Sequence, residues 1–152
     1  MTMTIEKHVD VNVPPGEAYS NWWHSFETGE ISDDVEAVEP AGPQRYRWHA
    51  NIAGIDEEWI AEVTERIPGR RIAWTSRAGA PNAGCVTFHR LGQEHTRVML
   101  QLEFQPERVL ERIGAWLGFV DRRVDAALDD FKVRVESESS AAAAPSVRPT
   151  PS

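Results

Sequence analysis

The feature that most constrains the fold is a pair of alternating runs separated by one short break. In the first run, residues 44–53, every second position on one face is apolar: Tyr46, Trp48, Ala50 and Ile52. The second run, residues 55–67, places these side chains on one face: Ile55, Glu57, Trp59, Ala61 and Val63. A period of two is typical of half-buried β-strands. The break, Ala53-Gly54, suits a two-residue hairpin turn because glycine adopts a positive φ at little cost.

A two-residue turn fixes which residues of this hairpin stand opposite each other. On one face, Trp48 is opposite Trp59 and Ala50 is opposite Glu57. The two indoles therefore form a predicted cross-strand aromatic pair. On the other face, His49 is opposite Glu58, which favours a surface pair worth under about 1 kcal/mol over a catalytic dyad.

Alternation and helical periodicity divide the rest of the chain. Further strands are predicted at residues 4–13, 35–38, 72–76, 84–90 and 96–104. A short helix opens near Pro15 and ends between His24 and Gly29, and a second helical turn is expected over residues 31–34. From Glu107 to about Glu136, apolar residues recur at three- and four-residue steps, which predicts a long amphipathic helix.

This order of elements predicts an α+β fold. We expect a curved antiparallel sheet of about six or seven strands wrapped around the long C-terminal helix, with one or two short helices after the first strand. A sheet that grips one helix leaves room between them, and that room is a natural ligand cavity. Lys7 is the exception on the otherwise apolar face of the first strand, and we expect it near the open end of that strand.

Length and composition indicate one globular domain. A chain of 152 residues with 41% hydrophobic and 26% charged residues is typical of a soluble protein, and we assign residues 1–136 to a single domain. The tail, residues 137–152, reads SESSAAAAPSVRPTPS and is predicted to be disordered, because it has little apolar area to bury. The sequence shows no signal peptide and no membrane-length apolar stretch. Cys85 is the one cysteine, so we expect no internal disulfide and a cytoplasmic location.

The charge argues against nucleic-acid binding. The net charge is −8, whereas nucleic-acid binders need a basic face that neutralises phosphates. Between Glu27 and Glu39 the chain has six acidic residues and no basic one. This segment is either a solvated face, which we favour, or a metal site, but it matches no calcium-loop pattern. No H-E-x-x-H motif occurs, so we expect no metal and no cofactor, and a monomer or homodimer without integral membrane association.

The stretch Ala78 to Gly84, AGAPNAG, is rich in turn residues. It lacks the lysine of a phosphate-binding loop, precedes a strand and not a helix, and contains no G-x-S-x-G nucleophile elbow. Its glycines, proline and asparagine favour a structural hairpin connection. A position on the rim of a ligand cavity is the alternative.

The tryptophans give the candidate site. Trp74 joins Trp48 and Trp59 on the inner face if its apolar side points inward, and the three either pack as core or line a cavity for a flat or aliphatic ligand. Glu57 is the polar residue on that face. It is the candidate general acid or base, with Tyr46 and Ser76 as hydrogen-bonding partners; alternatively it reaches water or pairs with an arginine or Lys7. The predicted ligand-binding set is Tyr46, Trp48, Trp59, Trp74, Ser76, Phe88, Leu100, Trp116, Val120 and Val124.

Several phrases of this chain resemble the START-related superfamily (SRPBCC), in its small bacterial polyketide cyclase/dehydrase-like branch. The matching stretches are VNVPPGEAYSNW (residues 11–22), WHANIAG (48–54), EWIAEVTERIP (58–68), RIAWTSRAGAPNAGCVTFH (71–89), TRVMLQLE (96–103) and RRVDAALDDFK (122–132). The likeness spans about residues 4–136 and is most specific from Arg71 to His89. It implies a helix-grip fold with a hydrophobic pocket.

The chain departs from this family's pattern in one segment. Relatives carry an aromatic- and proline-containing second helix where this chain has the acidic stretch from Phe26 to Asp34. Because that segment borders the pocket mouth in such folds, the ligand or its gate is expected to differ. No arginine of the dedicated aromatase/cyclases can be placed here by motif.

Three functions follow from these observations. The first is intracellular binding of a hydrophobic small molecule such as a lipid, a quinone or a polyketide-like compound, in a cavity between the sheet and the C-terminal helix. The second is a polyketide cyclase/dehydrase that promotes aldol closure and water loss on a bound chain, with Glu57 in an acid/base role. The third, with the least support, is a partner-binding role in which residues 27–39 meet a basic protein.

Overall fold

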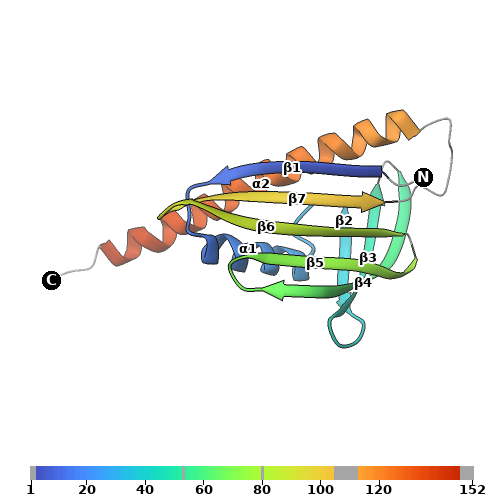
Figure 1. The fold of residues 1–152 in the computed structure, drawn as a ribbon, viewed down its shortest axis with the longest axis horizontal. Coiled ribbons are helices and arrows are strands. Elements are labelled where there is room, and N and C mark those ends of the chain that lie inside the picture. Colours follow the sequence, from blue (N-terminus) through green and yellow to red (C-terminus); the bar gives the residue numbers. More distant parts are fainter. Residues whose placement is uncertain (1–2, 53, 80, 105–112, 148–152) are drawn as a thin grey trace.

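The computed structural model describes residues 3–52, 54–79, 81–104 and 113–147, which form one antiparallel sheet and two helices (Figure 1). The sheet has seven strands in the order β1-β7-β6-β5-β4-β3-β2. Their bounds are β1 Met3–Val11, β2 Val35–Pro40, β3 Arg45–Ile52, β4 Ile55–Ile67, β5 Arg71–Gly79, β6 Asn82–Gly92 and β7 His95–Phe104. The predicted α+β class and curved antiparallel sheet are confirmed, although several strand ends differ by one to three residues from those expected.

The β3–β4 hairpin has the predicted register. Trp48 is opposite Trp59, Ala50 is opposite Glu57, and His49 is opposite Glu58. Gly54 has φ of 82°, as the short turn requires. Between β4 and β5 the pairing slips twice, between Ile60/Ala61 and between Val63/Glu65. Such irregularities bend strands, so they contribute to the curvature of the sheet.

Helix α1, Pro15–Thr28, follows β1 as predicted. It begins after Pro14 and ends at Gly29, which has φ of 82° and forms a left-handed C-cap. The second helix expected over residues 31–34 is absent, and the segment forms turns instead. The Ser32 hydroxyl accepts a hydrogen bond from the Asp34 amide, and the Val35 amide bonds to the Ser32 carbonyl. Such short side-chain bonds to the backbone compete with helix formation.

Helix α2, Ile113–Val147, runs beside β1 and crosses the sheet obliquely (Figure 1). The predicted start near Glu107 lies outside the described residues. The predicted end near Glu136 was wrong, because the helix continues to Val147 through the stretch for which the sequence predicts disorder. The alanines at 141–144 explain the extension, since alanine is the strongest helix former.

Two sets of ion pairs hold α2 from opposite sides. On one side, the Lys7 ammonium of β1 lies 3.1 Å from Asp121 Oδ2 and 3.3 Å from Asp125 Oδ2. On the other side, Arg123 Nε lies 2.9 Å from Asp34 Oδ2, in the turn before β2. Lys7 therefore interrupts the apolar face of β1 because its partners are on α2.

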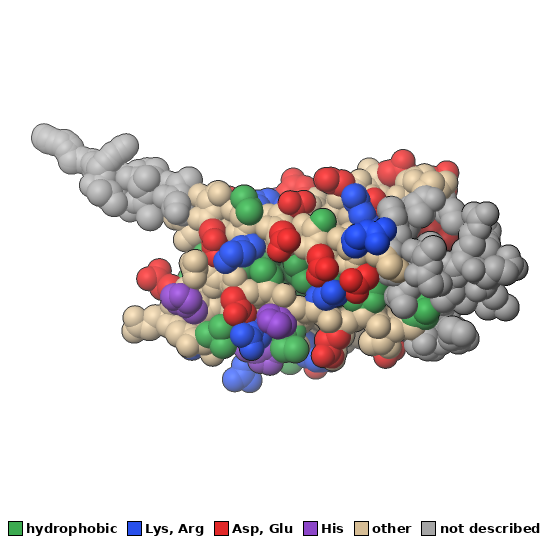
Figure 2. Space-filling model, turned by 90° about the horizontal axis from the view of Figure 1, so that it is seen from above, with side chains coloured by type: hydrophobic (Ala, Val, Ile, Leu, Met, Phe, Trp, Pro, Cys, Tyr) green, Lys and Arg blue, Asp and Glu red, His purple; other side chains and the backbone are tan. Residues whose placement is uncertain are grey.

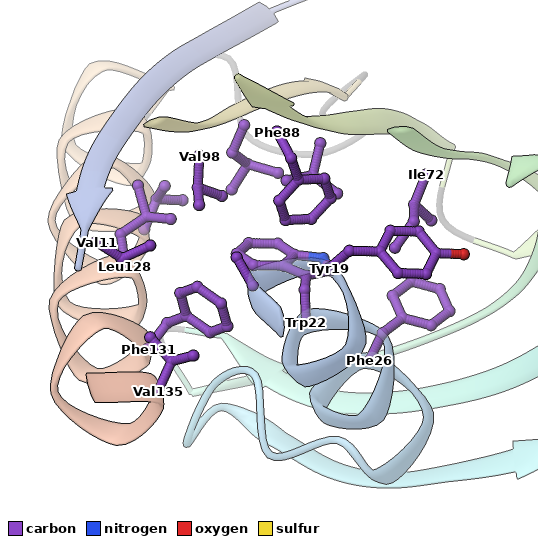
Figure 3. Packing of buried hydrophobic residues seen from close by; sticks show 14 of the residues in the cluster. Val11, Tyr19, Trp22, Phe26, Ile72, Phe88, Val98, Leu128, Phe131 and Val135 are labelled. Atoms are coloured by element: carbon purple, nitrogen blue, oxygen red, sulfur yellow. The ribbon is translucent and has the colours of Figure 1, made fainter. Parts of the chain in front are cut away.

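The densest part of the core lies where α1, α2 and one end of the sheet meet. Figure 3 shows Phe131 and Leu128 of α2 pointing toward Trp22 of α1, below the sheet residues. Phe131 and Trp22 meet edge to face with ring centroids 5.1 Å apart. The apolar side chains larger than alanine that are exposed by no more than 2% are Val11, Val13, Trp22, Ile72, Val86, Val98, Leu128, Phe131 and Val135. We call this set the packed half of the core.

Candidate functional site

A second cluster of the core consists of aromatic rings on the inner face of β3, β4 and β5. Trp48 and Trp59 stack across the β3–β4 pair with centroids 5.8 Å apart and planes 15° apart. Phe26 of α1 joins them, with its ring 4.9 Å from Trp48 and 5.5 Å from Trp74. The cross-strand indole pair predicted from the hairpin is thus confirmed, and Trp74 shares its face.

This cluster is less completely covered than the packed half. Trp48 is exposed by 6%, but Tyr46, Trp59 and Trp74 are half-buried. On β7, Leu102 and Phe104 are half-buried as well, and they pack against the same core. Val120 of α2 is also half-buried against it. We call the set Phe26, Tyr46, Trp48, Trp59, Trp74, Leu102 and Phe104 the aromatic half of the core.

Three members of the aromatic half were missed by the sequence analysis. Phe26 lies within the bounds predicted for the first helix and was not in the predicted ligand-binding set. Leu102 and Phe104 continue the inward face that Val98 and Leu100 begin, so the period of two along β7 was sufficient to find them. The signal was present, but strand alternation alone does not tell which end of a sheet is less covered.

Two glycines of the AGAPNAG stretch permit close packing near the indoles. A Cβ at Gly84 would lie 2.5 Å from the Trp74 ring, because Gly84 is the cross-strand partner of Trp74. A Cβ at Gly79 would lie 2.1 Å from the Glu58 carbonyl oxygen. β5 ends at Gly79 and β6 begins at Asn82, so the stretch connects two hairpin strands, as expected. Its position on a cavity rim stays a prediction.

Glu57 is half-buried on the same face as Trp59 and opposite the buried Ala50. Within the described part of the chain, no ion pair or hydrogen bond engages its carboxylate. The alternative pairing with Lys7 is wrong, because Lys7 contacts Asp121 and Asp125. Glu57 is therefore a carboxyl group on the same face as Trp59, without an ion pair or hydrogen bond to the described side chains.

The two expected partners of Glu57 lie elsewhere. Tyr46 and Ser76 both flank Ala61, which is four residues, or about 13 Å, from Glu57 along β4. The Tyr46 hydroxyl donates to Glu27 Oε2 at 3.5 Å, and burial, followed by the Glu27 charge, raises the pKa of Tyr46. The Ser76 hydroxyl donates to the Ala78 carbonyl at 3.2 Å. The structure thus does not bring these three groups together.

The remaining described members of the predicted ligand-binding set belong to neither of these two halves. Phe88 is exposed by 6% and packs edge to face on Tyr19 of α1 at 5.7 Å. Leu100 and Val124 are buried, at 7% and 8% exposure, and Val120 is half-buried. The side chain of Trp116 lies outside the described residues.

A depression of about 470 Å³ lies away from the aromatic half. It is bordered by the end of α1, the start of β2 and one residue of α2: Thr28, Gly29, Glu30, Ser32, Asp33, Val35 and Arg134. Its lining is polar, unlike the cavity expected between the sheet and the helix. Among the described residues, no group of His, Cys, Asp and Glu is placed to hold a metal ion. Asp34 of the neighbouring acidic segment is paired with Arg123 of the same chain.

The outer surface carries mixed charge. Figure 2 shows acidic and basic side chains interspersed over one face of the molecule. On the sheet, the His49 ring lies 3.2 Å from Glu58, with His49 partly exposed and Glu58 exposed, so the predicted surface pair is present. Arg77 and Arg45 hydrogen-bond to Glu62 and lower the pKa of that carboxyl. None of the described helices has the length and hydropathy to span a bilayer.

Comparisons with known proteins give a family and a fold. The family model described as polyketide cyclase/dehydrase and lipid transport matches residues 11–132. A curated relative, an uncharacterized 17.2 kDa protein in the melC2-rnhH intergenic region of Streptomyces lincolnensis, is 42% identical over 134 residues, which cover 87% of this chain and 89% of that protein.

Two crystal structures illustrate the fold likeness. TTHA0849 from Thermus thermophilus has a TM-score of 0.74 at 22% identity, covering 90% of this chain and 99% of that one. The Zhui aromatase/cyclase from Streptomyces sp. R1128 has a TM-score of 0.70 at 17% identity, covering 90% and 94%. The seven-stranded sheet with a helix after its first strand and a long C-terminal helix is therefore a helix-grip fold.

Proposed function

We propose that this chain, which belongs to the polyketide cyclase/dehydrase and lipid transport family, binds a hydrophobic small molecule against the aromatic half of its core. The ligand is a lipid, a quinone or a polyketide-like compound, bound inside the cell by a monomer or homodimer. The observation that carries this proposal is that Trp59 and Trp74 are only half-buried. The members of the packed half, in contrast, are exposed by no more than 2%.

The energetics favour an apolar ligand. Burying apolar surface is worth about 25 cal/mol per Å², and one aromatic side chain buries about 150–250 Å² in full. Half-buried indoles, with half-buried Leu102 and Phe104 beside them, can gain part of that free energy from a ligand. Flat or aliphatic molecules provide the matching surface, whereas charged ligands would lose hydration.

A neutral fluorescent probe, N-phenyl-1-naphthylamine, tests the binding function. We expect saturable fluorescence enhancement with the wild-type protein, and about tenfold weaker binding in Trp59→Ala, since lost ring contact of about 1.4 kcal/mol gives this factor. Leu91→Ala is the matched control, because Leu91 is an apolar residue of the same sheet that is 51% exposed. Native mass spectrometry of the purified protein can detect a ligand that stays bound during purification. Equal affinity of Trp59→Ala and wild type would contradict the proposal.

A second candidate function is catalysis of the cyclase/dehydrase type. The observation that favours it is the Glu57 carboxylate, which lies beside the aromatic rings without a described partner. A carboxylate there can take a proton from a bound chain and return it to a leaving hydroxyl. The Glu57→Gln variant is expected to lose turnover of a poly-β-ketone. Its folding and its binding of N-phenyl-1-naphthylamine are expected to stay unchanged. Unchanged turnover in that variant would remove Glu57 from the reaction.

A further inference from the structure

Two indole N–H groups are buried without a hydrogen-bond partner among the described residues. They belong to Trp22 and Trp48, which are exposed by 2% and 6%. Each indole meets one phenylalanine ring edge to face: Trp22 meets Phe131 at 5.1 Å and Trp48 meets Phe26 at 4.9 Å. Buried donors are almost always paired, so each of these two groups requires an explanation.

The surroundings of the two indoles differ. Trp22 lies in the packed half, where its partner Phe131 is fully buried. Trp48 lies in the aromatic half, and the ring stacked on it belongs to the half-buried Trp59. A ligand that lies against Trp59 therefore adjoins the Trp48 ring, since the two rings are stacked with centroids 5.8 Å apart. Among the ring contacts of the described residues, Trp22 meets Phe131, which is fully buried and not half-buried as Trp59 is.

We propose that Trp48 is a specificity-determining residue whose indole Nε1–H donates a hydrogen bond to an oxygen of the bound ligand. This inference rests on the proposed binding function and narrows its ligand class. An indole N–H is a donor only, so it selects an acceptor. The ligand is then an apolar molecule that carries a carbonyl or ether oxygen, and a pure hydrocarbon of the same shape binds more weakly because the donor stays unpaired.

A matched pair of probes tests this selection. 2-Acetylnaphthalene and 2-ethylnaphthalene have the same ring system and differ by one carbonyl oxygen, and each is titrated against bound N-phenyl-1-naphthylamine. The measured quantity is the affinity for the ketone divided by the affinity for the hydrocarbon. We expect this ratio to be about tenfold higher in the wild-type protein than in Trp48→Phe, and a tenfold change corresponds to about 1.4 kcal/mol. Phenylalanine keeps an aromatic ring at position 48 and removes the donor.

The unsubstituted protein gives an independent readout that does not depend on the folding of the variant. In ¹⁵N-labelled protein with assigned indole signals, the Trp48 Nε1–H signal is expected to move downfield with 2-acetylnaphthalene and not with 2-ethylnaphthalene. The Trp22 signal is the internal control, because it is equally unpartnered but lies in the packed half, and it is expected to stay in place with both probes.

The outcomes separate this inference from the proposed function. Two results would contradict the role of Trp48 and leave the binding site in place. One is an equal ratio of ketone to hydrocarbon affinity in the wild type and in Trp48→Phe. The other is a Trp48 indole signal that does not respond to the ketone. The Trp48 N–H would then face the Phe26 ring. If neither probe nor the fluorophore binds, the binding function itself is wrong and this inference falls with it.

Discussion

Both halves of the core consist mainly of apolar side chains, but the two halves are covered differently. In the packed half, Phe131 and Val98 are fully buried between α1, α2 and the sheet. In the aromatic half, Trp59 and Trp74 are large apolar side chains that remain half-buried. Under the proposed function, the packed half stabilises the fold and the aromatic half provides apolar surface to a ligand. Substitutions in the two halves should therefore have different consequences.

The largest expected effect is the loss of a ring from the packed half. Phe131→Ala removes a fully buried side chain and should lower the free energy of unfolding by about 3–5 kcal/mol, measured by urea denaturation. Val133→Ala on the same helix is the control, because Val133 is 65% exposed and its change should stay within about 0.5 kcal/mol. A small decrease in the free energy of unfolding of Phe131→Ala would show that the packed half is not the stabilising one.

A smaller effect is expected from crowding the aromatic half. In Gly84→Ala the new methyl would lie 2.5 Å from the Trp74 ring, so the indole must move. We expect destabilisation of about 1–3 kcal/mol and a shift in tryptophan fluorescence. Gly16→Ala is the matched control, because no atom lies within 4 Å of its Cβ. Adding Trp74→Ala should relieve part of the cost of Gly84→Ala, because the Gln101 carbonyl oxygen, 3.0 Å from the new methyl, remains in place. An additive double variant would contradict the contact with Trp74.

Acid should weaken the tether that joins α2 to Asn12, the residue that follows β1. Lys132 Nζ lies 2.7 Å from Glu136 Oε2, and this contact, with the Asn12 amide, lowers the pKa of Glu136 below its ordinary 4.5. The stabilisation of the fold by the ionised Glu136 carboxylate is therefore complete above about pH 4.5 and disappears as the pH falls through the lowered pKa of Glu136.

Glu136→Gln tests this tether. We expect it to reduce the stability at pH 7 by about 0.5–1 kcal/mol and to change it less at pH 3. Urea midpoints at the two pH values measure the difference. A penalty that is the same at both values would show that the Glu136 charge is not involved.

The smallest effect is expected where Lys7 of β1 pairs with Asp121 and Asp125 of α2. Hydrogen bonding to Asp121, assisted by Asp125, raises the pKa of Lys7 above 10.5. The stabilisation of the fold by the charged Lys7 ammonium is therefore complete below pH 10.5 and disappears as the pH rises through the raised pKa of Lys7. Since Lys7 is partly exposed, we expect only a small decrease in Tm between pH 9 and strongly alkaline pH, absent in Lys7→Met. Added salt should reduce the decrease, and a salt-independent one would argue against the ion pairs.

Much of the fold could be predicted because its local signals agree. The alternation around Ala53-Gly54 set the β3–β4 register, including the pairing of Trp48 with Trp59, and Gly29 marked the end of α1. The end of α2 was missed because low hydrophobicity was taken to outweigh the helix propensity of the alanine run. In residues 31–34, side-chain bonds to the backbone replaced the expected helical turn.

The candidate site was predicted less completely, for a geometric reason. Alternation tells which face a residue occupies but not how far apart two residues of that face lie. Tyr46 and Ser76 share the face of Glu57, yet both are beside Ala61 and not beside the carboxylate. Phe26 comes from another element, and its contacts with Trp48 and Trp74 depend on how α1 docks. Tertiary packing decides such distances, and no local pattern encodes them.

The most direct test of the division between the two halves is a measurement of intermolecular nuclear Overhauser effects with bound N-phenyl-1-naphthylamine. The account predicts contacts from probe protons to the ring protons of Trp59 and Trp74, and none to Trp22 or Phe131. Contacts confined to exposed side chains such as Leu91, or to the packed half, would contradict it.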